Sequence, residues 1–279
     1  MAQTMLITGA NTGIGKAAAE ALAAQGHRVY LACRSEHKTR PVIEEIARKT
    51  GNQEIRFLPL DLTSLASVRA CAAAFLDTGE PLHVLMNNAG VAGQQGVTED
   101  GFELTFGVNH LGHFLLTTLL LERLGDSAPS RIVNVSSIAH TQAKGIDWEA
   151  VRQPTKHVTA LPEYAVWKLA NVLFTQELAR RLHGTGVTAY AVHPGGIGSD
   201  IWSRRLPSFM RGPVNAVIGL VMKSTTEGAR TQVWCATAPE LATESGKYYD
   251  DCAEKTPNPA ATPELAAELW ARSEEWTNG

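Results

Sequence analysis

The sequence predicts an α/β fold in which helices cover both faces of a doubly wound parallel β-sheet. Short apolar runs alternate with longer segments of helical composition along the chain. A glycine-rich turn follows the first apolar run and precedes the first helical segment. The chain has 279 residues, 44% of them hydrophobic, which is enough for a large core in one domain.

The first thirty residues make the clearest structural unit. Residues 5–7 are a short apolar run that suits a strand buried on both faces. Residues 16–25 are rich in alanine, which favours helix, and Gly26 follows where a helix often ends. Residues 29–33 form a second apolar run. The order strand, turn, helix, strand predicts a βαβ unit.

The turn between the first strand and helix is a candidate phosphate site. Glycines let a pyrophosphate approach the backbone, and a helix starting near Ile14 points free N–H groups and its positive dipole end toward it. The pattern is T-G-x-x-x-G-x-G, not G-x-G-x-x-G, but it lies between a strand and a helix as such a motif must. The predicted dinucleotide contacts are Gly9, Asn11, Thr12, Gly13, Ile14 and Gly15.

The end of the second strand indicates which dinucleotide binds. A carboxylate about 20 residues beyond the glycines would bond the ribose 2′-hydroxyl of NAD. Here the strand ends Ala32-Cys33-Arg34, and a guanidinium can bond a 2′-phosphate in two places. We therefore predict NADP(H), the alternative being that Arg34 is a solvated surface side chain.

The remaining elements continue the alternation. Further strands are expected at 55–60, 82–86, 132–135, 187–192 and 247–249, and further helices at 40–50, 63–76, 102–124, 164–182, 226–237 and 263–276. Residues 138–163 are less regular. Residues 200–222 are apolar and basic with flanking Gly and Pro, and follow a strand's C-terminal end, which predicts a helical substrate lid at about 199–225. We expect a single Rossmann-type catalytic domain over 1–279 with a tail helix at about 263–276.

Several polar residues stand where strands end. Asp61 is either a helix cap or an adenine contact, and its position favours the cofactor edge of the sheet. Asn87-Asn88-Ala89-Gly90 is small enough for its backbone to pass close to a ligand, although a plain turn has the same composition. Asn109 lies inside a predicted helix, where asparagine is unfavourable, so it needs a surface position or a buried polar task.

Tyr164 and Lys168 are four residues apart on one predicted helix and share a face. An ammonium beside a phenol is expected to lower the pKa of the phenol from about 10, which makes tyrosine a usable general acid or base. Ser137, at a strand end, could polarise a carbonyl oxygen, and Asn109 could hold a water that links Lys168 to solvent. Each feature is weak alone, but their order along the chain is specific.

The chain resembles the short-chain dehydrogenase/reductase superfamily, and within it the retinol dehydrogenase branch. The matching stretches are ITGANTGIGK (7–16), LACR (31–34), NNAG (87–90), VNHLGHFLLT (108–117), RIVNVSS (131–137), Y-x-x-x-K (164–168) and AVHPG (191–195). The resemblance implies NADP(H) and a catalytic tetrad of Asn109, Ser137, Tyr164 and Lys168. The further cofactor contacts it implies are Leu62, Asn88, Ala89, Gly90, Pro194, Gly195, Ile197 and Ser199, with Tyr164 and Lys168 themselves.

The activity implied is hydride transfer between a nicotinamide and a lipophilic aldehyde, ketone or alcohol, with Tyr164 as proton donor or acceptor. Two alternatives remain open: reduction of a carbon–carbon double bond, as in the related protochlorophyllide reductases, and a non-catalytic NADP(H)-binding regulator. Two departures stand out. We expect no N-terminal membrane segment of the kind common in animal members of this branch, and Trp167 stands before the lysine where the family usually has a small residue.

Bulk properties exclude other classes of partner. The net charge of −3 favours neither nucleic acid nor an anionic membrane, and four scattered cysteines fit a reducing, cytoplasmic setting. The first strand begins too early for a signal peptide, and no apolar run is long enough to span a membrane. No metal motif is present, so we expect no metal and treat His110 and His113 as structural. Trp270 and Trp276 should pack on the fold or on a partner in a homo-oligomer.

Overall fold

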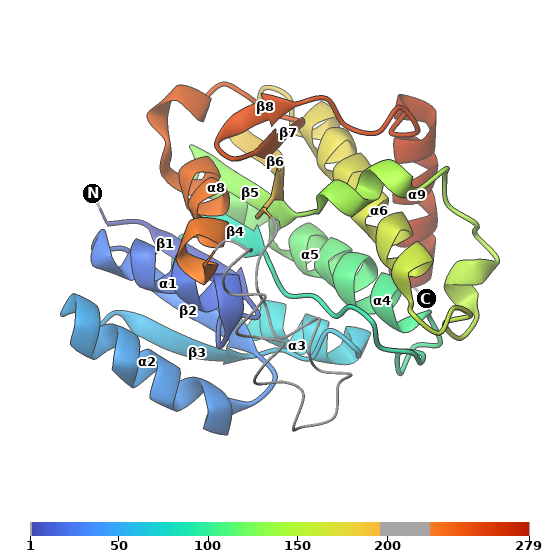
Figure 1. Cartoon of the computed structure of the whole chain (residues 1–279). Helices are drawn as coiled ribbons and strands as arrows, with labels where there is room; N and C mark the ends of the chain where they lie inside the picture. Colours follow the sequence, from blue (N-terminus) through green and yellow to red (C-terminus); the bar gives the residue numbers. More distant parts are fainter. Residues whose placement is uncertain (1, 196–223, 279) are drawn as a thin grey trace.

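The computed structural model describes residues 2–195 and 224–278 (Figure 1). The expected lid therefore lies almost wholly outside the described residues, as do Ile197 and Ser199. The described residues form one eight-stranded sheet in the order β3-β2-β1-β4-β5-β6-β7-β8, parallel except for the antiparallel edge strand β8. The strands are β1 Thr4–Thr8, β2 Arg28–Cys33, β3 Ile55–Pro59, β4 Val84–Asn87, β5 Ser130–Val135, β6 Val187–His193, β7 Lys247–Asp250 and β8 Ala253–Lys255.

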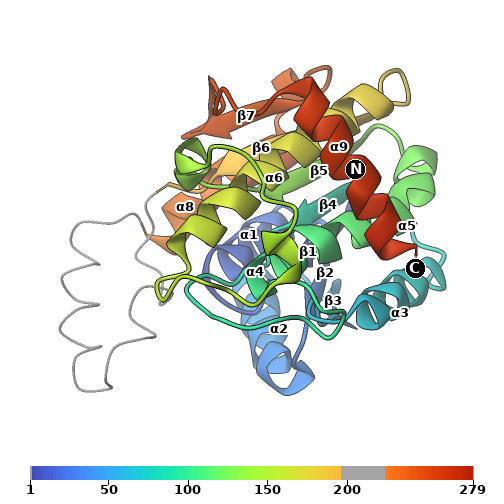
Figure 2. The same cartoon turned by 90° about the vertical axis from the view of Figure 1, so that its right-hand side faces the viewer.

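Helices cover both faces of the sheet, which confirms the predicted fold class (Figures 1 and 2). One face packs against α1 Gly13–Ala24, α2 Glu36–Thr50 and α8 Thr225–Thr237, and the other against α3 Leu65–Leu76, α5 Gly112–Asp126 and α6 Leu161–Arg181. Helix α9 Pro263–Thr277 packs on the outside of this second layer. Successive side chains of β1 show the reason. Met5 and Ile7 belong to the core of the first face and Leu6 to that of the second, as period-two alternation requires.

The strand order reverses between β1 and β4. The chain winds outward from β1 to β2 and β3, then returns to β4 and winds the other way through β5, β6 and β7. Loops at the C-terminal ends of β1 and β4 therefore diverge and leave a crevice, which is where open α/β sheets bind ligands.

Three element boundaries differ from the predictions. Helix α2 begins at Glu36 because the Ser35 side chain accepts a hydrogen bond from the Lys38 backbone, and Pro41 is tolerated inside the helix. Helix α6 begins at Leu161, with Pro162 in the first turn, where no backbone donor is needed. The long helix expected around Asn109 runs through α4 Leu104–Phe106 and α5 but is interrupted by a π-helical turn, Gly107–Leu111.

Helix α9 lies across α5 and α6, as Figure 2 shows. Trp270 is buried, and its ring centroid lies 5.0 Å from that of Phe114 on α5 and 5.9 Å from that of Phe174 on α6. The guanidinium of Arg181 stacks on the outer side of the indole, 4.3 Å from its centroid. The expectation that the tail tryptophans pack on the fold is confirmed for Trp270.

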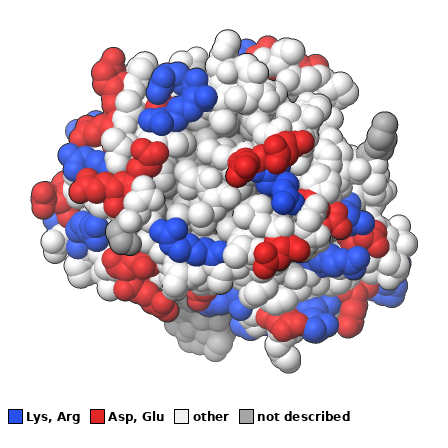
Figure 3. Space-filling view, turned by 180° about the vertical axis from the view of Figure 1, so that it is seen from behind, with Lys and Arg blue, Asp and Glu red and all other residues white. Residues whose placement is uncertain are grey.

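One apolar helical stretch and the charge distribution bear on possible membrane and nucleic-acid contacts. In the described part of the chain one helical stretch, Leu104–Asp126, is long and apolar enough to cross a bilayer, but 78% of its apolar window is buried in the fold. Burial of this kind is typical of a core helix. Figure 3 shows acidic and basic side chains interspersed on one face, in line with the small net charge.

Two buried histidines couple the fold to pH. His110 is fully buried, with its Nε2 3.0 Å from the Ser273 hydroxyl of α9, and burial lowers its pKa to about 3. Burial also lowers the pKa of His113 to about 4. Both rings are therefore neutral in the folded protein at pH 5, where an unfolded histidine of pKa about 6.5 is protonated.

We predict that the folded state loses stability as the pH falls from about 6.5 toward 4. In this range each of the two histidines binds a proton in the unfolded chain but stays neutral in the folded chain. The free energy of unfolding therefore falls by about 1.4 kcal/mol per pH unit for each such histidine. In urea unfolding between pH 7.5 and 5, His110→Phe should flatten this dependence by about one proton. The exposed-site control His37→Gln should leave the slope unchanged. A slope in His110→Phe equal to that of the wild type would contradict the assignment.

Candidate active site

The turn after β1 is shaped by two glycines that other backbone touches. A Cβ on Gly9 would lie 2.9 Å from Cα of Ala89, and one on Gly15 would lie 2.4 Å from Nδ2 of Asn88 and 2.6 Å from the Gly9 carbonyl oxygen. Both contacts are shorter than side chains tolerate. The loops that follow β1 and β4 are therefore pressed together, and only glycine fits at these two points.

Gly13 has a different role at the start of α1. Its φ of +59° is left-handed, and nothing lies within 4 Å of where its Cβ would stand. The Thr12 side chain makes no capping hydrogen bond, so it leaves the first N–H groups of α1 to other partners. Asn88 adds a buried Oδ1 without a partner among the described residues. Open space, free amide donors and a positive helix end fit a cofactor carrying phosphates.

A hydrogen-bond chain that the sequence did not reveal joins this turn to the candidate tetrad. The Thr8 hydroxyl oxygen accepts from the backbone N–H of Asn88 at 3.0 Å and of Ala89 at 2.9 Å, and lies 2.9 Å from Nε2 of His113. Nδ1 of His113 lies 3.1 Å from the carbonyl oxygen of Asn109. A carbonyl only accepts, so Nδ1 carries the proton and Nε2 accepts from Thr8.

Asn109 stands in the π-helical turn, fully buried. Its Oδ1 accepts from the Val91 backbone N–H at 2.7 Å, and its Nδ2 donates to the Val91 carbonyl at 2.8 Å. The side chain thus pins the loop that carries Asn88, Ala89 and Gly90. These hydrogen bonds explain why an asparagine occurs inside a helix. Turns of π-helix often mark functional positions. A water relay through Asn109 stays a prediction.

Lys168 is buried at the carboxyl end of β5. Its Nζ donates to the Val135 carbonyl at 2.9 Å, and Nδ2 of Asn171 donates to the same oxygen at 3.1 Å. Ser136 donates from its hydroxyl to the Lys168 carbonyl at 2.7 Å, which fixes the helix against the strand. These bonds anchor α6 to the end of β5.

Ser137 and Tyr164 meet above this anchor. Of the two adjacent serines, Ser137 acts on the Tyr164 phenol and favours a lower pKa of that phenol, whereas the Ser136 hydroxyl donates to the helix backbone. Tyr164 is half-buried, and Nζ of Lys168 lies 5.7 Å from its ring centroid. The structure therefore brings Ser137, Tyr164 and Lys168 together, with Asn109 holding the adjoining loop.

The electrostatics of this pair correct one expectation. Burial raises the pKa of Tyr164 above its ordinary value, and hydrogen bonding by Ser137 only partly opposes the rise. Burial also lowers the pKa of Lys168 well below its ordinary value. The i,i+4 spacing alone predicts a lowered phenol pKa, and that prediction is wrong for this structure because desolvation raises the pKa by more than Ser137 lowers it.

Arg34 and Asp61 lie together at the ends of β2 and β3. The Arg34 side chain is 75% exposed, and its Nε lies 3.9 Å from Oδ2 of Asp61. Oδ1 of Asp61 accepts from the backbone N–H and the hydroxyl of Thr63, at 3.0 and 2.8 Å. Asp61 is thus held in a local turn before α3, whose N-cap is Ser64, and its second oxygen faces Arg34. A surface pair of this length is weak, which leaves the guanidinium available to a stronger anion.

The positions of the other predicted cofactor contacts say less about cofactor binding. Leu62 is buried against Gly112, so only its backbone could reach a cofactor. Pro194 and Gly195 follow β6 at the same sheet edge, and Gly195 has a left-handed φ of +81°. Three or more His, Cys, Asp or Glu side chains in a metal-binding arrangement do not occur in residues 2–195 and 224–278.

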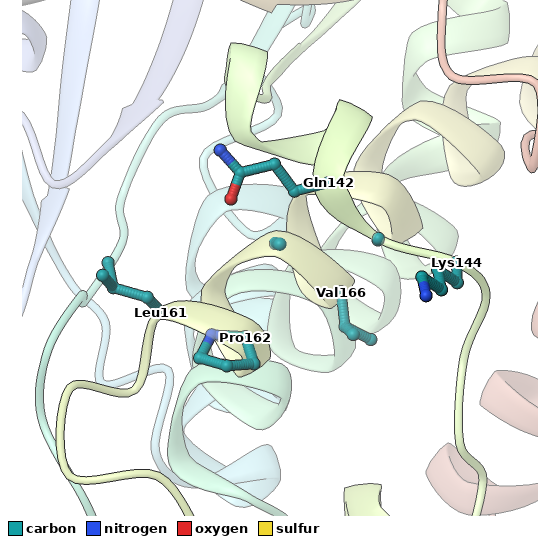
Figure 4. Close-up of a pocket in the computed structure, with 7 residues that line it drawn as sticks. Gln142, Lys144, Leu161, Pro162 and Val166 are labelled. Atoms are coloured by element: carbon teal, nitrogen blue, oxygen red, sulfur yellow. The ribbon is translucent and has the colours of Figure 1, made fainter.

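Exposed apolar side chains gather at the carboxyl edge of the sheet. The large hydrophobic residues that are exposed in the described ranges all lie in loops after β4 and β5 or at the start of α6: Val97, Ile138, Val158 and Leu161. A hollow of about 310 Å³ lies beside the first turns of α6 (Figure 4). Its lining is mainly apolar, with Pro162 and Val166 on the helix and Lys144 on the facing segment.

Comparison with known proteins places this geometry in a family. The sequence pattern of the short chain dehydrogenase family matches residues 3–208. Retinol dehydrogenase 12 of Mus musculus is 47% identical over 270 residues, which cover 96% of this chain and 84% of the relative. Retinol dehydrogenase 11 of Homo sapiens is 48% identical over 270 residues, covering 96% and 83%.

Solved structures agree with the fold. A protein of uncharacterised function from Mycobacterium paratuberculosis superposes with a TM-score of 0.77 at 33% identity, over 99% of this chain and 93% of its own. Actinorhodin polyketide ketoreductase, crystallised with NADPH, gives a TM-score of 0.68 at 25% identity, over 89% and 95%.

Proposed function

The chain belongs to the short-chain dehydrogenase family and to its retinol dehydrogenase-like branch, and from this premise we propose that it interconverts a lipophilic aldehyde or ketone and its alcohol with NADP(H). The observation that carries the proposal is the meeting of Ser137, Tyr164 and Lys168 at the end of β5, beside the glycine turn of β1. The two arms of the site, a phosphate cradle and a proton donor, lie at one sheet edge.

The chemistry divides between cofactor and protein. When bound, the reduced nicotinamide supplies a hydride to the carbonyl carbon. Ser137 orients the carbonyl oxygen by a hydrogen bond, and Tyr164 gives that oxygen its phenolic proton. In the reverse direction Tyr164 accepts the proton from the alcohol. Lys168, held by the Val135 carbonyl, stabilises the phenolate that forms after transfer.

The direction of the Tyr164 pKa suits the reductive half of this reaction. Because burial raises that pKa, the phenol keeps its proton at neutral pH and is ready to donate. Oxidation of an alcohol requires the phenolate and is therefore favoured at higher pH. Tyr164 thus serves carbonyl reduction at lower pH, as the phenol, and alcohol oxidation at higher pH, as the phenolate.

Within the family's choice between NAD(H) and NADP(H), Arg34 supports NADP(H). The second strand ends on this exposed guanidinium, with a weakly paired Asp61 beside it. A 2′-phosphate would replace that weak pair with a stronger, two-point one. The exposed apolar side chains around the site support a lipophilic substrate, because such a rim is costly to leave in water. A cytoplasmic location and a homo-oligomer stay predictions.

Tyr164→Phe should lower kcat by about 10²- to 10⁴-fold, since it removes the proton donor. NADPH affinity should change little, because the ring and the Lys168 contact remain. The measurement is nicotinamide absorbance with a panel of aldehydes and ketones, with NADPH binding followed separately by fluorescence. Near wild-type turnover would remove Tyr164 from the mechanism.

Turnover of an enone at its double bond, with ketones untouched, would favour the double-bond reductase alternative.

Arg34→Gln should weaken NADPH binding by about 10- to 100-fold and leave NADH binding nearly unchanged, because a charged hydrogen bond to the 2′-phosphate is worth about 1.5–3 kcal/mol. The measurement is the dissociation constant of NADPH and of NADH for the wild type and the variant. Arg56→Gln, a change of the same type on the outer part of β3, is the matched control. Equal loss for both dinucleotides would show that another residue selects the cofactor.

Bulky apolar aldehydes should show a higher kcat/KM than small polar ones. Ile138 follows Ser137 directly and is 55% exposed, so Ile138→Ser should narrow this difference by removing apolar contact at the mouth of the site. The control Val97→Ser changes a more distant rim residue and should act more weakly. Equal efficiency on short and long aldehydes in every variant would exclude the lipophilic assignment.

A further inference from the structure

Trp167 occupies the centre of the candidate site, although its side chain bears no acid or base. The indole is 2% exposed, and Nζ of Lys168 lies over its face, 3.8 Å from the ring centroid. The Tyr164 ring meets it edge-on, with centroids 4.9 Å apart and planes at 79°. One aromatic ring thus touches both partners of the proposed proton transfer.

The third neighbour of the indole is the loop that Asn109 pins. A methyl group placed on Gly90 would lie 3.7 Å from Cη2 of Trp167 and 3.1 Å from Oδ1 of Asn109. No hydrogen bond sets the ring's position, because the indole Nε1 is buried without a partner among the described residues. The position follows from packing against Gly90, Tyr164 and Lys168.

The indole ring of Trp167 offers the buried Lys168 ammonium a stabilising contact that its hydrogen bonds do not. This ammonium has left water almost completely, and within the described residues it makes one hydrogen bond, to the Val135 carbonyl. A buried ammonium with too few partners loses its proton. The electron-rich face of an indole attracts a cation, most strongly where water is excluded. Trp167 supplies that face at contact distance.

We propose that Trp167 is a positioning residue of this site, whose indole face keeps the buried Lys168 side chain charged and beside the Tyr164 phenol. The inference rests on the proposed function for its catalytic meaning but on the structure alone for its geometry. Trp167 touches no reacting atom in this account. It acts through Lys168, and through Lys168 on the ease with which Tyr164 releases its proton.

The other titratable groups around the pair do not supply this charge. His113 on α5 interacts electrostatically with Lys168 but stays neutral because it is buried. Tyr248 on β7 interacts with Tyr164, and burial keeps its phenol protonated at neutral pH. On β5 the facing groups are the Val135 carbonyl and the hydroxyls of Ser136 and Ser137. Among the described residues, Lys168 is therefore the one group beside the phenol that can carry a positive charge.

The experiment is an optical titration of the Tyr164 phenolate in the full-length protein without added cofactor. Each variant is measured with and without the additional substitution Tyr164→Phe, and the difference isolates this one phenol. Trp167→Leu keeps an apolar side chain but removes the aromatic face, and should raise the Tyr164 midpoint by about one pH unit, the size expected for a desolvated cation–π contact. Trp167→Phe, with a weaker aromatic face, should give a smaller shift of the same sign.

A double-mutant cycle separates this role from simple packing. In the Lys168→Met background, Trp167→Leu should no longer move the Tyr164 midpoint. The control Trp234→Leu, on α8, should move nothing. An unmoved midpoint in Trp167→Leu and Trp167→Phe, or an equal shift with and without Lys168, would overturn the proposal. Should Trp167→Leu not fold, Trp167→Phe alone decides by the same criterion.

The activity measurement is kept separate. With a carbonyl substrate, the pH profile of kcat/KM should move in the same direction as the optical midpoint. If no carbonyl compound is reduced, the proposed function fails, yet the optical titration still decides whether Trp167 controls the charge beside Tyr164.

Discussion

The close approach of the loops after β1 and β4 is the constraint on which the candidate site depends. The Thr8 hydroxyl accepts from both Asn88 and Ala89, and the glycines at 9 and 15 leave no room for a side chain between the two loops. From there His113 and Asn109 carry the same network to the loop in front of Trp167. The glycine turn and Asn109 are therefore parts of one hydrogen-bonded network, built on the pairing of β1 with β4.

The features that could be predicted from sequence are those that depend on short-range spacing. The glycine turn is defined within eight residues by the strand before it and the helix after it, and the four-residue step from Tyr164 to Lys168 fixes a shared helix face. The alternation of apolar runs with helices was enough to predict the sheet and its two covered faces. Among the described elements, the antiparallel edge strand β8 and the starts of α2 and α6 were not foreseen.

The features that escaped prediction arise from packing between distant segments. The π-helical turn at Asn109 accompanies hydrogen bonds to distant segments: the Asn109 amide pairs with Val91, and its carbonyl oxygen lies against Nδ1 of His113. The direction of the Tyr164 pKa depends on how much water burial removes, which residue spacing does not report. Trp167 looked like an unexplained bulky residue in the sequence. Its contacts with Lys168 and Tyr164 become visible only once the helix is laid against the sheet.

The cover that α9 provides has a consequence for the way the protein is made. Trp270 packs on Phe114 and Phe174, yet it follows Lys168 of the candidate site by about a hundred positions in the chain. At ribosomal speeds of about 5–20 residues per second, α6 emerges roughly 5–20 s before the helix that shields it. For that interval the aromatic faces of α5 and α6 stand open to chaperones and to other nascent chains. The helix that carries Tyr164 and Lys168 therefore stays uncovered, and open to misassembly, until synthesis reaches α9.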